Sequence, residues 1–319
     1  MRHTRHGYWL EEAGPVEAAV PLAGEARADD RDVGGGYLGL WTAWQLAEAG
    51  AEVAIVEAEL CGHGPSGRNG GFVSSLWDQL PGLVERFGTE RALAVGRASE
   101  AAVAEIGAWC AAHEIDAWYR AAPQLEVATT AAQEGAWQEV ARACRRAGID
   151  EAVELDRDAV QAVCASPVFG AGISMRTSAT VQPARLALGL RRRLLERGVR
   201  IFEHSPVTRL TPAGIATAEG SIRAGETVLA VNSATASFPG FRGALAVASS
   251  HIVLTEPVPE VLEELGWTGG EAIADARTPG RCCTTSGRRT TDGSPSAGEA
   301  AGWVTAPGGV SSWSSTRMR

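Results

Sequence analysis

The run Gly34-Gly35-Gly36-Tyr37-Leu38-Gly39 is the feature that most restricts what this chain of 319 residues can fold into. It satisfies the pattern G-x-G-x-x-G and leads into residues 37–49, whose apolar side chains recur at helical spacing and end at Gly50. The apolar residues 53–56 then predict a strand. A glycine-rich turn that opens a helix, with a buried strand after it, is typical of a Rossmann-like α/β fold.

The glycines and the helix start have separate predicted roles. Gly34 permits the tight turn, Gly36 lets the backbone approach a pyrophosphate, and Gly39 allows close helix–strand packing. Tyr37 begins the helix, whose first N–H groups attract phosphate. Glu57 follows the next strand, about 20 residues beyond the glycines, where an acidic side chain bonds the ribose hydroxyls of a dinucleotide. A carboxylate there favours a ribose without a 2′-phosphate, because it would repel that group. The pattern predicts a dinucleotide site, although glycine turns before helices are common and a strand-end carboxylate can simply be solvated.

The segment before the glycines does not suit its expected position. A central parallel strand is normally a continuous apolar run, but this one reads Asp29-Asp30-Arg31-Asp32-Val33. Burying such charges without partners costs several kcal/mol each. Either the central strand of the sheet is damaged, or two compensating frame shifts have replaced an apolar strand.

A second glycine-rich segment, Cys61–Phe72, follows the predicted strand. Its glycines exclude regular structure and allow close backbone approach to a ligand, while Ser66, Arg68 and Asn69 supply hydrogen-bond donors. A flexible surface turn is the plainer interpretation of the same residues.

Taken together, Gly34–Gly39, Glu57 and Gly64–Phe72 resemble the FAD-dependent D-amino-acid-oxidase-type (DAO) superfamily, in particular its gamma-glutamylputrescine oxidoreductase-like branch. The resemblance extends from Tyr8 to about Arg277. It implies an α/β fold: an FAD/NAD(P)-binding Rossmann-like domain with an inserted mixed α+β substrate domain, incomplete at the C-terminus.

The resemblance also implies which residues contact FAD. Val207 would lie beside the adenine through its backbone, and His63 would lie near the flavin with the loop. His251 would lie on the flavin side or the substrate side, but a histidine satisfied within a strand is the plainer interpretation. A covalent flavin link at Cys61 is disfavoured. The full cofactor-binding set is Gly34, Gly36, Tyr37, Gly39, Glu57, Ser66, Gly67, Arg68, Asn69, Gly70, Gly71 and Val207.

The implied activity is oxidation of a small-molecule amine or amino acid by hydride transfer to flavin, followed by imine release and hydrolysis. Oxygen or another acceptor would reoxidise the flavin. No catalytic residue is assigned, because a neutral amine substrate needs no general base. Two alternatives stay open: an NAD-dependent dehydrogenase, which gives no reason for the second glycine loop, and an inactive, truncated remnant of a flavoenzyme.

Helix and strand patterns divide the chain into three regions. Long helices are expected at 89–118, at 131–146 after the capping-box pattern Thr130-x-x-Gln133, and at 183–197. Strands are expected at 199–202, 221–224 and 227–231. The expected regions are an N-terminal extension at 1–28, the oxidoreductase at 29–277 with FAD-binding segments 29–80 and 180–235 and substrate segments 81–179 and 236–277, and an aberrant tail at 278–319.

Residues 278–319 contain no Leu, Ile, Phe or Tyr. Such a segment buries too little apolar surface to offset its ordering entropy, so we expect disorder. We further predict that a shifted reading frame encodes it, which sequencing of the DNA would test. A chain without the closing elements of the family would hold FAD weakly.

The overall composition restricts the expected binding partners and the expected location of the protein. A net charge of −9 argues against nucleic acid or an anionic membrane as partner. No apolar run approaches the roughly 20 residues needed to span a bilayer. The cysteines form no CxxC or metal-ligand spacing, so we expect no metal and a cytoplasmic location with reduced thiols.

Overall fold

The structure, a computed structural model, describes residues 7–211, 214–238, 240–241, 243–245, 247, 250–276, 285–290 and 300–307. At 250–251, 285–290 and 300–307 it describes the backbone alone. The chain divides into two units. Unit 1 contains residues 1–72, 104–120 and 180–247, and unit 2 contains residues 73–103, 121–179 and 248–319. The N-terminal extension therefore belongs to unit 1.

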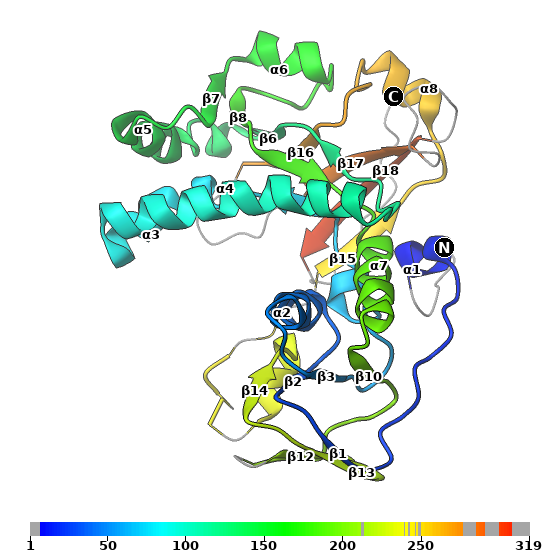
Figure 1. Ribbon diagram of the computed structural model, residues 1–319. Coiled ribbons are helices and arrows are strands. Elements are labelled where there is room, and N and C mark those ends of the chain that lie inside the picture. Colours follow the sequence, from blue (N-terminus) through cyan, green and yellow to red (C-terminus); the bar gives the residue numbers. More distant parts are fainter. Residues whose placement is uncertain are drawn as a thin grey trace. The chain divides into compact units, whose positions relative to one another are not determined.

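Unit 1 is built on a four-stranded sheet of order β10-β3-β2-β14 in which all strands run parallel (Figure 1). Helices α2 and α7 lie on one face of this sheet. The other face packs on a second sheet of order β1-β13-β12-β11 through a core that includes Val33, Val56 and Ile222. The elements of unit 1 are α1 (Tyr8–Ala13), β1 (Gly24–Arg27), β2 (Asp30–Val33), α2 (Tyr37–Glu48), β3 (Val53–Val56), η1 (Pro65–Gly67), α7 (Pro183–Glu196), β10 (Arg200–Phe202), β11 (Arg209–Thr211), β12 (Gly214–Ala216), β13 (Gly220–Arg223), β14 (Glu226–Leu229) and η4 (Asn232–Ser237).

The local signals of unit 1 act as expected. Helix α2 begins at Tyr37, directly after Gly36, and Gly50 follows its last turn with a φ of +88°. Helix α7 has Pro183 at its first position, where its missing N–H would have no intrahelical acceptor. Strand β3 spans Val53–Val56 as predicted, and all of its residues are buried.

Unit 2 contains a seven-stranded sheet of order β15-β18-β17-β16-β6-β8-β7, whose pairs are antiparallel except β16 with β6. Its core includes Trp77, Leu80 and Ile173. The elements are η2 (Trp77–Gln79), α3 (Leu80–Phe87), β6 (Gln124–Val127), η3 (Ala131–Gln133), α5 (Gln138–Ala147), β7 (Ala152–Leu155), α6 (Arg157–Val163), β8 (Gly172–Met175), β15 (Ser250–Leu254), α8 (Pro259–Glu264), β16 (Ala272–Asp275), β17 (Thr285–Thr290) and β18 (Ala300–Pro307). Residues 89–103 of helix α4 (Thr89–Ala112) belong to unit 2, and its residues 104–112 belong to unit 1. The short strands β4 (Phe72–Ser74), β9 (Ser178–Thr180) and β5 (Arg120–Ala121) form a three-stranded sheet.

Two predicted helices are shorter than their patterns indicated. The first ends at Ala112 rather than 118, because Glu114 adopts a left-handed φ of 52°. In the second, Thr130 and Gln133 do form the capping box, but it opens a single 3₁₀ turn. Gly135 then takes a φ of +77°, so the α-helix starts only at Gln138.

Two segments of the expected tail, Thr285–Thr290 and Ala300–Pro307, form the backbone strands β17 and β18. They pair with each other and with neighbouring strands of the sheet in unit 2. Ladder hydrogen bonds join backbone groups and so need no large apolar side chain. Residues 278–284, 291–299 and 308–319 of the expected tail lie outside the described residues.

Candidate functional site

A cavity of about 710 Å³ opens at the carboxyl ends of the parallel strands in unit 1. Ligands of open α/β sheets bind at this edge. The residues lining it are Val33–Leu38, Val56–Ala58, Gly62, Gly64–Ser66, Asn69, Ser205–Val207, Ala230–Asn232, Ala234, Ser237 and Phe238. Of the residues predicted from sequence, it brings together Gly34, Gly36, Tyr37, Glu57, Ser66, Asn69 and Val207.

The turn before α2 depends on its glycines. Gly34 has a φ of +111°, and a Cβ atom there would lie 2.5 Å from the carbonyl oxygen of Ala230. A Cβ atom on Gly39 would overlap the carbonyl oxygen of Gly34. Gly39 therefore allows the helix to pack against the turn and does not itself line the cavity.

The start of α2 faces the second glycine-rich loop. The backbone N–H of Tyr37 donates a hydrogen bond of 2.9 Å to Ser66 Oγ. A Cβ atom on Gly36 would lie 2.9 Å from the same oxygen. The bare backbone of Gly36 thus lets the Ser66 hydroxyl sit at the positive end of the helix, where that hydroxyl can still donate a hydrogen bond to an anion.

Glu57 joins the end of β3 to the glycine turn. Its Oε2 accepts a hydrogen bond of 2.6 Å from the N–H of Gly35, and its Oε1 accepts one of 2.9 Å from the N–H of Glu59. Gly36 and Glu57 line the same cavity. One cavity thus contains a helix start, the kind of group that binds a pyrophosphate, and a carboxylate, the kind of group that bonds ribose hydroxyls in dinucleotide sites.

The loop after β3 is held by its own polar groups. Asn69 Nδ2 donates to the carbonyl oxygen of Ser66 at 2.7 Å, and Asn69 Oδ1 accepts from the N–H of Gly71 at 2.7 Å. The N–H of Gly62 donates to the carbonyl oxygen of Gly35 at 2.8 Å, so the loop is tied to the glycine turn. Four predicted members of this loop, Gly67, Arg68, Gly70 and Gly71, do not line the cavity, and the exposed Arg68 instead bonds the carbonyl oxygen of Gly64.

The residues that line the cavity after β10 and β14 were not predicted from the sequence, apart from Val207. Ser205 and Pro206 follow β10, and Val231, Asn232 and Phe238 follow β14. The signal was available, because every parallel strand ends at the same edge and the residues just after it face the ligand.

Three further residues were considered near the flavin or substrate from the sequence: Cys61, His63 and His251. Cys61 is fully buried, does not line the cavity, and burial raises the pKa of its thiol well above the ordinary value. His63 does not line the cavity either. The backbone of His251 belongs to β15, while its side chain lies outside the described residues.

The central strand β2 is the exception to an otherwise apolar sheet. Arg31 is 1% and Asp32 0% exposed, and both Asp32 oxygens and Arg31 Nε lack a hydrogen-bond partner. Arg31 Nη1 donates to the carbonyl oxygen of Ala224 at 2.7 Å. Burial, with a smaller effect from Asp30, raises the pKa of Asp32 to about 7. The strand is therefore paired on both sides within the sheet, but the burial of Arg31 and Asp32 in it is unfavourable.

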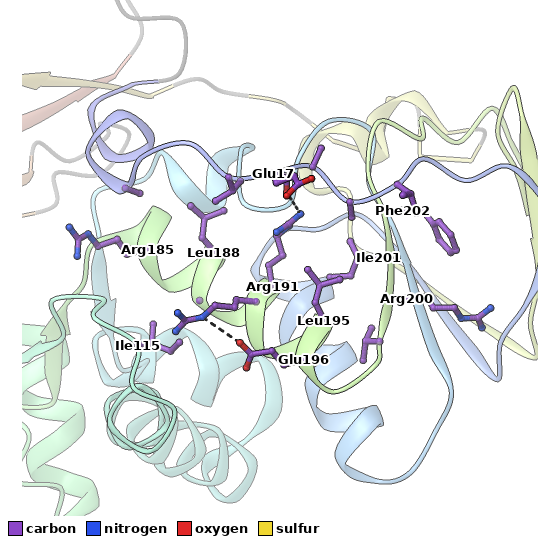
Figure 2. Close-up of a pocket in the computed structure, with 18 of the residues that line it drawn as sticks. Glu17, Ile115, Arg185, Leu188, Arg191, Leu195, Glu196, Arg200, Ile201 and Phe202 are labelled. Carbon is purple, nitrogen blue, oxygen red and sulfur yellow. Dashed lines mark hydrogen bonds and ion pairs between the residues drawn. The ribbon is translucent and has the colours of Figure 1, made fainter.

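A larger cavity of about 1120 Å³ lies between the N-terminal arm, residues 7–23, and α7 (Figure 2). None of the residues predicted from sequence lines it. Three of its arginines already carry carboxylate partners: Arg185 pairs with Glu12, Arg191 with Glu203, and Arg200 with Glu52. The smaller cavity is therefore the candidate site.

Within the described part of the chain, no helix is long and apolar enough to cross a membrane. The described residues also contain no group of three or more His, Cys, Asp or Glu side chains that could hold a metal ion.

The solved structures most useful for comparison share this fold. L-amino acid deaminase from Proteus myxofaciens superposes with a TM-score of 0.64 at 19% identity, over 91% of this chain and 60% of that one. Glycine oxidase from Geobacillus kaustophilus gives a TM-score of 0.61 at 19% identity, over 91% of this chain and 75% of that one.

Two relatives are similar in sequence. Gamma-glutamylputrescine oxidoreductase of Escherichia coli is 31% identical over 210 residues, which are 63% of this chain and 48% of the relative. The probable oxidoreductase OrdL of Rhizobium meliloti is 29% identical over 293 residues, 85% of this chain and 65% of the relative. The chain thus spans about half the length of the first relative and just under two-thirds of the second.

The family comparison covers most of the chain. A family model described as FAD dependent oxidoreductase (DAO) matches residues 33–305. The match begins later than the expected Tyr8 and continues past Arg277, where the resemblance was expected to end. The chain belongs to the DAO family of FAD-dependent oxidoreductases.

Proposed function

We propose that the chain binds FAD in the cavity at the carboxyl edge of the parallel sheet and oxidises an amine or amino acid. The observation that carries this proposal is the meeting of three elements in one cavity: the Gly34–Gly36 turn, the start of α2 and the Glu57 carboxylate. Family membership supplies the identity of the dinucleotide.

The residues present fit the adenine dinucleotide part of FAD. The start of α2 offers backbone N–H groups and its positive dipole end to the pyrophosphate, with Ser66 Oγ beside Tyr37 N–H as a further hydrogen-bond partner. Glu57 would accept hydrogen bonds from the ribose hydroxyls. The backbone of Val207, which lines the same cavity, would contact the adenine. Side chains at Gly34 or Gly36 would obstruct this arrangement.

FAD, when bound, supplies the hydride acceptor, and oxygen or another acceptor takes the electrons afterwards. The imine formed from the substrate is released and hydrolysed. The contribution of unit 1 is to hold the dinucleotide at a fixed place and to exclude a 2′-phosphate near Glu57. Relatives named for amines and amino acids support this substrate class.

A second candidate, a flavoenzyme remnant without activity, is favoured by one observation. In the central strand, both carboxylate oxygens of the buried Asp32 lack a hydrogen-bond partner, and the buried Arg31 is bonded through Nη1 to a carbonyl oxygen but not through Nε. Such a strand weakens the sheet on which the cofactor site is built.

Purification with and without added FAD separates the candidates. If the chain is the proposed enzyme, it retains a flavin spectrum after gel filtration. Its bound flavin is then reduced when one member of a panel of amines and amino acids is added. Peroxide production and reduction of an artificial dye identify the electron acceptor. Reduction of NAD without a bound yellow chromophore would support the dehydrogenase alternative, and absence of flavin after reconstitution would support the remnant.

A further inference from the structure

Glu203 is a buried carboxylate outside the candidate cofactor cavity. It follows β10 and is 0% exposed. Its Oε1 accepts hydrogen bonds of 2.8 Å from Arg191 Nε and 2.8 Å from the N–H of Cys61. Its Oε2 accepts bonds of 2.6 Å from Arg191 Nη2 and 2.6 Å from the N–H of Ala19. Both oxygens are thus fully occupied by donors from three separate segments.

The pair stays charged despite its burial. Desolvation alone would raise the pKa of Glu203, but the hydrogen bonds from Arg191, Ala19 and Cys61 hold it below its ordinary value. The hydrogen bonds to Glu203 raise the pKa of the Arg191 guanidinium. Removing one partner of such a pair leaves an uncompensated buried charge.

The three segments that meet at Glu203 include the start of the cofactor loop. Cys61 begins this loop, and the next residue, Gly62, donates its N–H to Gly35 of the glycine turn. On the other side, Arg191 Nη2 donates to the carbonyl oxygen of Glu17 at 2.8 Å, and Figure 2 shows this side chain reaching from α7 to the arm.

The contact with the arm is reinforced next to Glu203. Ser205 Oγ accepts a hydrogen bond of 2.9 Å from the N–H of Leu22 and donates one of 2.9 Å to the carbonyl oxygen of Glu203. Leu22 itself is 2% exposed and belongs to the core between the two sheets of unit 1. The arm is therefore fixed on both sides of Ala19.

We propose that Glu203, held by Arg191, is a positioning residue for the glycine-rich loop Cys61–Phe72, and that it ties this loop to the N-terminal arm. Neither Glu203, Arg191 nor Cys61 lines the cavity, so their effect reaches the dinucleotide only through the loop. This inference rests on the proposed function where it concerns FAD, but the order of the loop can be measured without any ligand.

The loop contains its own reporter. Arg68 is exposed and is the only Arg or Lys between Arg31 and Arg86, so tryptic cleavage after it gives a distinctive pair of fragments. The exposed Arg120, in the same unit, reports general loosening. In ligand-free protein, Glu203→Gln is expected to speed cleavage at Arg68 by about tenfold relative to Arg120, the factor for losing a hydrogen bond to a buried charge.

Two further variants keep the test decisive. Arg191→Lys keeps the positive charge but loses the paired donors of the guanidinium. It should speed cleavage at Arg68 relative to Arg120 by less than Glu203→Gln does, and it serves as the test if Glu203→Gln does not fold. Glu154→Gln is the control, because its carboxylate pairs with Arg145 at 2.7 Å on the surface of unit 2. It should leave the cleavage ratio unchanged.

The affinity for FAD provides the second measurement. At a temperature where circular dichroism shows a folded chain, the Kd for FAD should rise about tenfold in Glu203→Gln. Equal acceleration at Arg68 and Arg120, or no acceleration in either variant, overturns the positioning role. Failure of the unsubstituted chain to bind FAD refutes the proposed function instead, and leaves the cleavage ratio as the test of the loop.

Discussion

The carboxylate of Glu57 accepts a 2.6 Å hydrogen bond from the backbone N–H of Gly35, across 22 positions of sequence. The bond joins the end of β3 to the turn that opens α2. The same carboxylate also accepts from the N–H of Glu59. One side chain therefore shapes the turn and places negative charge at the edge of the candidate cofactor cavity.

This dual role makes Glu57 the sharpest test of the binding site. Glu57→Ala should weaken binding of ADP by about tenfold, because a charged hydrogen bond to the turn and the proposed ribose contact are both lost. It should also reduce discrimination against 2′-phosphorylated ADP, since the repelling carboxylate is gone. Isothermal titration with both nucleotides measures the two effects.

The matched control is Glu59→Ala. Glu59 is exposed and contributes only its backbone N–H to Glu57, which alanine retains. Equal losses of affinity in the two variants would contradict a specific role for Glu57.

Gly39→Ala should destabilise unit 1. The new Cβ atom would overlap the carbonyl oxygen of Gly34, so the helix must move away from the turn at a cost of about 1–3 kcal/mol. Gly82→Ala is the control, because a Cβ atom at this position in α3 meets nothing within 4 Å. Alanine there should stabilise the helix by up to about 1 kcal/mol. Urea denaturation compares the variants, and a stable Gly39→Ala protein would show that the packing is looser than described.

Asp32 should make the stability depend on pH. Its pKa is raised from 3.8 to about 7 by burial and by Asp30, so the folded state holds the proton more tightly than the unfolded state. The contribution of this proton to the free energy of unfolding is complete below pH 4 and is lost as the pH rises to about 7. The total loss is about 4 kcal/mol.

Asp32→Val removes the titrating group and suits the apolar neighbours in register, Ile55 and Val228. The variant should be more stable than the parent at pH 8, and its melting temperature should change less between pH 5 and 8. Asp150→Asn, at an exposed carboxylate, is expected to preserve the dependence of the parent. An unchanged pH profile in Asp32→Val would show that Asp32 is not the source.

Cys61 should not carry a covalent flavin. Its thiol is buried and its pKa is raised well above the ordinary value, so the nucleophilic thiolate is scarce. Acid precipitation of reconstituted protein should leave all flavin in the supernatant. Yellow colour that stays with the precipitate, and disappears in Cys61→Ala, would contradict this expectation.

The local elements of unit 1 could be predicted because they depend on near neighbours in sequence. The glycines around Tyr37, the proline at the start of α7 and the apolar run of β3 act through backbone dihedrals and hydrophobic periodicity. The pattern failed at residues 131–137, where a capping box opens only one turn before Gly135 redirects the chain.

The sequence by itself therefore determined the glycine turn, its helix and the acid after the next strand. Only the tertiary structure decided that the wall after β14 closes the cavity and that Glu203 joins the arm, α7 and the loop, since these groups lie far apart along the chain. It also placed the charged strand Asp30–Val33 at the centre of the sheet. Backbone pairing with β3 and β14 sets that position, although the side-chain pattern argued against it.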